Sequence, residues 1–405
     1  MAAPTAPRLG VDFPRPAGAE AASAAAHAAA HAAAIPWLAA AVLVAATSVV
    51  VGVIWDISWH MTIGRDTFWT PAHLAIYFGG IVGGLASGAV ALRTTFAGSE
   101  RERATSVRFW GFRAPLGAWF SIWGSFAMIT SAPFDDWWHG AYGLDVEILS
   151  PPHTVLAAGM VALALGAMLV LLAAQNRARE EAAGRWAWMY AYAAGCVLSF
   201  LAIMVTEYSW RTMQHTSLFY RVTCAVFPLF LVAAGNTTRH RWGATMVAGS
   251  YMAIRMVMLW VLPLFPAEPK LGPIYQDITH MVPMDFPLLL VAPAMAMDLL
   301  RRHMGTERWW RLALAQGGAF FAVFLVAQWL FAEFLVSPAS RNWFFHTQNF
   351  PYNLPKTTGY YRGVFSSFDA SRSALMAGLA TAAAYACVSA SLGAAWGRWL
   401  VRVKR

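Results

Sequence analysis

The chain alternates between long apolar segments and short polar ones, a pattern that predicts membrane-spanning helices. A span needs about 20 predominantly apolar residues, and about ten segments meet this requirement. Their approximate limits are 35–60, 71–93, 111–133, 152–175, 186–206, 216–235, 242–265, 283–300, 310–336 and 372–397. The predicted fold class is therefore all-α, a polytopic transmembrane helix bundle.

Basic residues collect in every second connection between the predicted spans. They are Arg93, Arg101, Arg103, Arg108 and Arg113, then Arg177, Arg179 and Arg185, then Arg239 and Arg241, then Arg301, Arg302, Arg308 and Arg311, and finally Arg402, Lys404 and Arg405. Positive charge is retained on the cytoplasmic side of a membrane. This pattern predicts that both termini are cytoplasmic and that the odd-numbered loops face outward, in the bacterial cytoplasmic (inner) membrane.

Composition supports a membrane protein and excludes several other classes. The 405 residues are 59% hydrophobic and only 12% charged, whereas a soluble domain has roughly 25% charged residues. The net charge of +9 follows membrane topology, so we expect no nucleic-acid partner. The three cysteines, Cys196, Cys224 and Cys387, each fall in an apolar segment without a CxxC motif. A disulfide framework or a thiolate metal site is therefore not expected.

The predicted spans divide the chain into three parts. Residues 1–34 are rich in alanine and proline and are expected to form a flexible or loosely helical cytoplasmic tail. Residues 35–175 form a four-helix unit that carries the chemistry described next. Residues 176–405 supply six further helices and a long outer segment at 338–371.

One polar constellation occurs twice, at the edges of apolar segments. The first copy, in WDISWHMTIGRDTFWTPAH, consists of Asp56, His60, Asp66 and His73. The second copy, in FDDWWHGAYGLDVEILSPPH, consists of Asp135, His139, Asp145 and His153. The first three positions recur 79 residues later and the fourth 80 residues later. Ligand-type side chains are costly near a membrane and persist mainly for function, so the duplication predicts two metal sites, or one site built by two matching hairpins.

The spacing of each copy suits a metal site at a helical hairpin. Asp56 and His60 are four residues apart and share one helix face, and Thr70-Pro71 starts the next helix with His73 in its first turn. Asp135, His139 and His153 repeat this arrangement. Two imidazoles and a carboxylate suit copper(II), zinc or non-haem iron(II).

The remaining acidic residues of the two copies are expected to support the ligands. Asp66 and Asp145 lie ten residues after Asp56 and Asp135. We expect them to orient a ligand histidine through its second ring nitrogen, or, for Asp66, to pair with Arg65.

Weaker candidates lie in other outer loops. Glu207 begins a sequence, EYSW, that echoes DISW of the first copy, and His215 follows it. Asp277 and His280 lie between the seventh and eighth spans. Each pair could ligate a metal or line the same cavity. The alternative is that these side chains are ordinary interfacial or structural polar groups.

At these residues the chain resembles the C subunit of the copper membrane monooxygenases, the methane and ammonia monooxygenases. DISWH, RDT and TPAH match that family's hairpin, which implies that Asp56, His60 and His73 are copper ligands and the catalytic group. The family's neighbouring site has Asn, His and His at the offsets where this chain has Asp135, His139 and His153, so Asp135 is a departure. The stretch GPIYQDITHMVPMD shows a faint similarity to the family's A subunit, which would make the chain a fusion.

The resemblance implies a copper-dependent membrane monooxygenase that oxidises a small apolar substrate, a hydrocarbon or ammonia, with O2. Copper is expected in preference to zinc or iron. Partner subunits would include a cupredoxin-like subunit and an electron donor, with membrane lipid around the bundle. The alternatives are a membrane copper-binding or copper-transport protein and a zinc-dependent membrane hydrolase.

Overall fold

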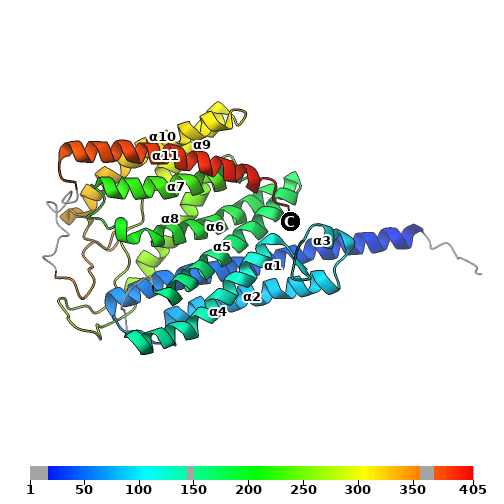
Figure 1. Cartoon of the computed structure of the whole chain (residues 1–405), viewed down its shortest axis with the longest axis horizontal. Helices are drawn as coiled ribbons and strands as arrows, with labels where there is room; N and C mark the ends of the chain where they lie inside the picture. The colour runs from blue at the N-terminus through cyan, green and yellow to red at the C-terminus, as the bar shows by residue number, and fades with distance from the viewer. Residues whose placement is uncertain (1–16, 144–149, 356–368, 405) are drawn as a thin grey trace, which may run out of the picture.

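The computed structural model describes residues 17–143, 150–355 and 369–404, with side chains described from Pro36 onward. Long helices dominate this part of the chain (Figure 1). They are α1 (Ala17–Thr62), α2 (Pro71–Phe96), α4 (Leu116–Tyr142), α5 (Pro151–Arg177), α6 (Glu180–Met204), α7 (Ser217–Thr237), α8 (Gly243–Val261), α9 (Val291–Met304), α10 (Trp309–Leu335) and α11 (Arg372–Leu400). The short elements are α3 (Glu100–Ala104), the hairpin strands β1 (Val107–Phe109) and β2 (Phe112–Ala114), and the 3-10 turns η1 (Thr206–Tyr208), η2 (Leu262–Leu264) and η3 (Pro338–Ser340).

Eight helices among the described residues are long and apolar enough to cross a membrane. They are Pro36–Thr62, Pro71–Phe96, Pro151–Arg177, Glu180–Met204, Ser217–Thr237, Gly243–Leu264, Trp309–Leu335 and Arg372–Leu400. Each coincides with one of the predicted spans, which confirms the prediction of an α-helical membrane bundle. The predicted count of ten also includes α4 and α9, which do not belong to this set.

Two predicted spans differ from the observed helices. The segment 283–300 is helical only over Val291–Met304, 14 residues, or about 21 Å at 1.5 Å per residue, which is less than the roughly 30 Å of a bilayer core. Pro283 and Pro287 disfavour a helix before that point. The segment 111–133 begins later, at Leu116, because a β-hairpin precedes it, and α4 continues past Pro133 to Tyr142.

The first four long helices pack as one group. The contacting pairs are α1 with α2, α4 with α5, α2 with α4 and α1 with α5. Small residues permit the close approach of α4 and α5: a Cβ on Gly124 would come within 2.6 Å of the Gly159 carbonyl oxygen. This packing places the α1–α2 hairpin beside the α4–α5 hairpin.

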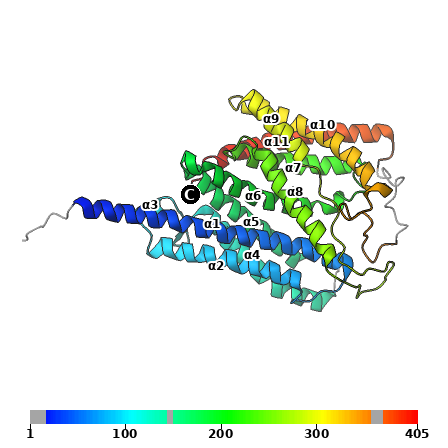
Figure 2. The ribbon, with the colours of Figure 1, turned by 180° about the vertical axis from the view of Figure 1, so that it is seen from behind.

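Loops from the second half of the chain gather at the end of the bundle where α1 stops (Figure 1). Lys270 and Tyr352 donate their backbone N–H groups to the carbonyls of Ile63 and Met61, at 2.9 and 3.1 Å. At the opposite end, the first residues of α1 project beyond the other helices, near α3 (Figure 2). The last turns of α1 are therefore held by segments more than 200 residues away in the sequence.

Candidate metal centre

The first histidine–aspartate cluster forms where α1 turns into α2. Asp56 and His60 occupy the last two turns of α1, and Gly64, with a positive φ of 82°, reverses the chain after the helix ends. Glycine adopts this left-handed conformation without steric cost. The hydroxyl of Thr70 accepts a 2.8 Å hydrogen bond from the Thr67 N–H rather than from α2, and His73 lies in the first turn of α2.

Four side chains of this first cluster converge. Nε2 of His73 lies 3.1 Å from Asp56 Oδ1 and 3.4 Å from Asp66 Oδ2. Nε2 of His60 lies 3.9 Å from Asp56 Oδ2 and 3.6 Å from Asp66 Oδ2. The ligand-type atoms of Asp56, His60 and Asp66 all lie within 4.8 Å of one another, an arrangement that could hold a metal ion.

The backbone selects which nitrogen of His73 faces the carboxylates. Nδ1 lies 2.9 Å from the carbonyl oxygen of Thr67, which can only accept a hydrogen bond. In a neutral imidazole the proton therefore resides on Nδ1, and Nε2 directs a lone pair at Asp56 and Asp66. A lone pair opposite carboxylate oxygens is repulsive unless a proton or a metal ion lies between them. The same use of one ring nitrogen to orient the other is the usual arrangement of metal-binding histidines.

Asp66 faces the same space as the other residues of the first cluster and does not lie behind a ligand histidine. Its Oδ2 faces the Nε2 atoms of both His60 and His73, whereas the sequence predicts a role in orienting a histidine or pairing with Arg65. Among the described residues, Arg65 is exposed and forms no ion pair. Two carboxylates thus lie together without an arginine or lysine, which favours a bound cation.

Replacing Asp66 with asparagine should weaken metal binding at the first cluster about as much as Asp56→Asn does, on the order of 100-fold. The reason is that both residues face the same imidazole nitrogens, and loss of a mere supporting group costs 10–100-fold. The measurement is a competition titration against a metal chelator. Arg65→Gln serves as the control and should bind as the wild type does. If Asp66→Asn bound the metal within about twofold of the wild type, Asp66 would not be a ligand.

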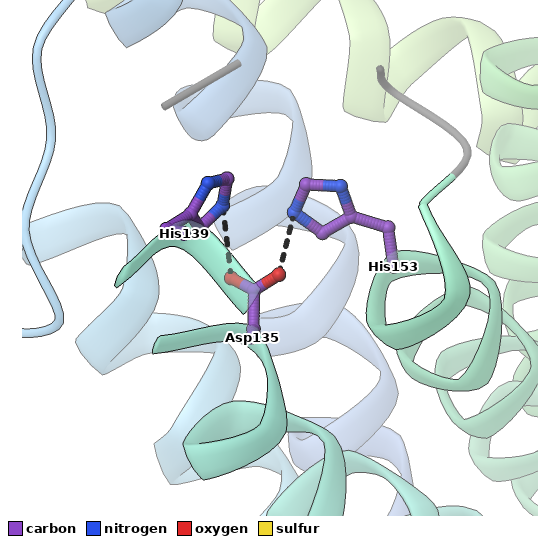
Figure 3. A group of neighbouring side chains, drawn as sticks. All are labelled: Asp135, His139 and His153. Atoms are coloured by element: carbon purple, nitrogen blue, oxygen red, sulfur yellow. Dashed lines mark ion pairs between the residues drawn. The ribbon is translucent and has the colours of Figure 1, made fainter. Parts of the chain in front are cut away.

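The second cluster repeats the arrangement at the α4–α5 junction, where Asp135 points between two imidazoles (Figure 3). His139 Nε2 lies 3.5 Å from Asp135 Oδ2, and His153 Nε2 lies 3.2 Å from Asp135 Oδ1. The three ligand-type atoms again lie within 4.8 Å of one another. The structure thus brings together the residues predicted for this site, whereas Asp145 lies outside the described residues.

Local backbone contacts also orient the second cluster. Nδ1 of His139 lies 3.2 Å from the carbonyl oxygen of Gly143, the residue that ends α4. Ser150 starts α5 as its cap and accepts a hydrogen bond from the His153 N–H, at 3.3 Å. The imidazole of His139 therefore presents Nε2 to Asp135 for the same reason that His73 presents Nε2 in the first cluster.

Both clusters fit a metal ion by their dimensions. Two atoms bound to one ion at about 2.0–2.2 Å lie roughly 3–4 Å apart, and the nitrogen–oxygen separations in the two clusters run from 3.1 to 3.9 Å. Asp56 Oδ1 and Asp135 Oδ1 are buried and accept no hydrogen bond within the described residues. Each of these oxygens faces an imidazole Nε2, at 3.1 Å for His73 and 3.2 Å for His153, and a cation between the two atoms would satisfy both.

The two clusters are neighbours, because α2 packs against α4. The pKa of Asp135 is lowered although burial opposes the shift, chiefly through His153 and His139, and His73 of the first cluster is near enough to contribute. Tyr77 lies one turn after His73, with its ring 6.2 Å from that imidazole. Its phenol is near enough to interact electrostatically with Asp56 and Asp66 of the first cluster and Asp135 of the second. Tyr77 was not predicted from the sequence, although its spacing of four residues from His73 was a usable signal.

The segment between η2 and α9 supports the first cluster. Ser58 and Thr62, on α1 around His60, are buried. Ser58 donates its hydroxyl to the Val282 carbonyl, and Thr62 Oγ1 accepts the Val282 N–H at 2.8 Å. This support orients the helix end that carries Asp56 and His60.

The weaker candidates from the sequence do not join either cluster. Glu207 is exposed and interacts with Trp210 at 3.5 Å. His215 is buried, lies with Nε2 2.8 Å from the Trp329 carbonyl, and stacks on that indole; burial lowers its pKa. Asp277 and His280 are exposed in the loop after α8. In the described part of the chain, these four residues form no metal-type group.

Comparisons of this chain with models of protein families, with curated proteins and with solved structures found no match.

Proposed function

We propose that this protein is a copper-dependent membrane monooxygenase subunit that oxidises a small apolar substrate, a hydrocarbon or ammonia, with O2. The observation that carries the proposal is the pair of neighbouring clusters in which imidazole Nε2 atoms face carboxylate oxygens at 3.1–3.9 Å. Asp56, His60, Asp66 and His73 would hold one ion, and Asp135, His139 and His153 would hold the other.

The choice of copper comes from the motifs. Imidazole and carboxylate ligands suit copper(II), zinc and iron(II) alike, and the match of DISWH, RDT and TPAH to the copper membrane monooxygenases favours copper. Copper, when bound, would supply the redox chemistry that activates O2. The extra carboxylate of Asp135, where that family has Asn, adds negative charge and favours a more highly charged ion.

The protein's own residues would hold, orient and shield this centre. The carbonyls of Thr67 and Gly143 fix the imidazoles of His73 and His139. Large apolar side chains lie close to His73 in the chain: Trp69 is 71% exposed and Phe78 is 52% exposed. An apolar substrate dissolves in the membrane, so this surface would let it approach the centre laterally.

The proposed topology follows from the loop charges. Basic loops on the cytoplasmic side of a bacterial inner membrane would put both clusters, which lie at the other end of the helices, on the periplasmic side. Electrons would have to come from a separate donor, and a cupredoxin-like subunit is the expected partner. The described residues contain no cysteine cluster that could relay electrons.

The direct test is oxidation by the purified, copper-loaded protein in nanodiscs, supplied with a reductant, O2 and either ammonia or a short alkane. The proposal expects product that contains an oxygen atom from 18O2. Copper retained without any 18O product would contradict the proposal in favour of a copper-handling protein. Tightly bound zinc with hydrolytic activity would contradict it in favour of a hydrolase.

A further inference from the structure

A cavity of about 70 Å³ lies at the other end of α2 from the metal clusters. Its lining comes from α1, α2, α3, α5 and the turn before α4. Leu38, Val90, Pro115, Val170 and Ala173 make one part of the wall apolar. Arg93, Arg177 and Glu102 supply charge, and Thr94 supplies a hydroxyl. The cavity therefore combines an apolar wall with polar groups at one end of a membrane helix bundle.

The side chains that line this cavity carry more positive than negative charge. Arg93 forms an ion pair with Glu102, which also accepts hydrogen bonds from Ser99 at the start of α3. Arg177 faces no carboxylate among the described residues, and its guanidinium donates to the Lys404 carbonyl at 3.3 Å. Two arginines against one glutamate leave one positive charge for an anionic ligand.

The hydroxyl of Thr94 is a second feature that suits a ligand, separate from the charges. The residue is only 8% exposed and lines the cavity. Its hydroxyl makes no hydrogen bond to the described residues, whereas the hydroxyls of Thr105 and Ser106 donate to backbone carbonyls of α3. Because Thr94 lines the cavity, its hydroxyl is available to donate a hydrogen bond to an oxygen of a ligand.

Aromatic residues near this cavity are typical of a membrane–water interface. The β1–β2 hairpin carries Trp110, which is 78% exposed. Its ring contacts Phe109 at 5.1 Å and Trp123 at 5.5 Å. Tryptophan collects at the level of lipid headgroups, and Arg108 and Arg113 lie on the same hairpin. The cavity thus lies at the depth where a phospholipid places its phosphate.

We infer that this cavity binds the headgroup phosphate of an anionic phospholipid, with Arg177 and Thr94 contacting the phosphate, the adjoining carbons of the lipid against Leu38, Val90 and Val170, and the acyl chains outside the cavity in the bilayer. Basic pockets between membrane helices are suited to anionic headgroups. The apolar wall favours a lipid over free phosphate, since a small ion would leave that wall unpartnered. This inference is independent of the metal ions.

Native mass spectrometry of the full chain in detergent, mixed with equal amounts of phosphatidylglycerol and phosphatidylcholine, tests this inference. The wild type should retain phosphatidylglycerol in preference. Arg177→Gln should retain about fivefold less, and Thr94→Val, which keeps the shape, roughly threefold less. Arg179→Gln is the control, because Arg179 is exposed nearby and does not line the cavity.

Three results would overturn the inference. The first is equal retention of the two lipids by the wild type. The second is retention of phosphatidylglycerol by Arg177→Gln and Thr94→Val at the wild-type level. The third is complete displacement of the lipid by millimolar inorganic phosphate, which would identify free phosphate as the occupant.

Discussion

Replacing His60 with alanine should remove the metal ion from the first cluster and abolish oxidation. His60 contributes one of the two imidazoles that face Asp66 Oδ2, at 3.6 Å. Its loss leaves two carboxylates with a single histidine, so affinity at this cluster should fall by more than the roughly 100-fold expected for a supporting residue. The measurement is bound copper per chain together with 18O product in wild type and variant.

The fold should survive this substitution. His60 is partly exposed at a helix end, and α1 stays anchored by the contacts of Ser58 and Thr62 with Val282. His303→Ala, at an exposed position at the end of α9, is the control and should keep both copper and activity. Unchanged copper content in His60→Ala would contradict the assignment of the first cluster.

Replacing Asp135 with leucine should empty the second cluster, and Asp135→Asn should have a smaller effect. Both imidazoles of this cluster face Asp135, and the oxygen that faces His153 is buried. Leucine removes both oxygens. Asparagine keeps one oxygen and loses the charge, so we expect a loss of about 10–100-fold in copper affinity. Chelator competition with His60→Ala as the background isolates the second cluster.

Asp136 provides the matched control for this pair. It is the adjacent carboxylate, it is exposed, and it does not belong to the cluster. Asp136→Asn should therefore bind copper as the wild type does. If Asp136→Asn and Asp135→Asn lost affinity equally, general negative charge near α4, rather than ligation by Asp135, would explain the binding.

The membrane helices could be predicted because hydropathy is a property of contiguous sequence. Eight helices lie where the apolar segments predict them. The exception at 283–300 has a specific cause. There the chain contains two prolines, and Asp285 forms an ion pair with Arg211, 3.0 Å away, before α9 begins. Such a contact between distant loops has no counterpart in local hydropathy.

The positions of the cluster residues on helices could be predicted from the sequence, whereas the position of Asp66, which lies in a loop, could not. Asp56 with His60 and Asp135 with His139 follow the four-residue repeat of a helix. Asp66 lies in a turn whose path depends on Gly64, against which the Tyr352 side chain packs, so its direction is set by residues far away in the sequence. The same reason explains His215, whose partner Trp329 is 114 residues away.

Copper counted per chain by inductively coupled plasma mass spectrometry tests the central claim most directly. The four proteins are the wild type, His60→Ala, Asp135→Leu and the double variant, each loaded with copper and washed under identical conditions. We expect about two ions in the wild type, one in each single variant and none in the double variant. The same copper content in all four proteins would contradict it.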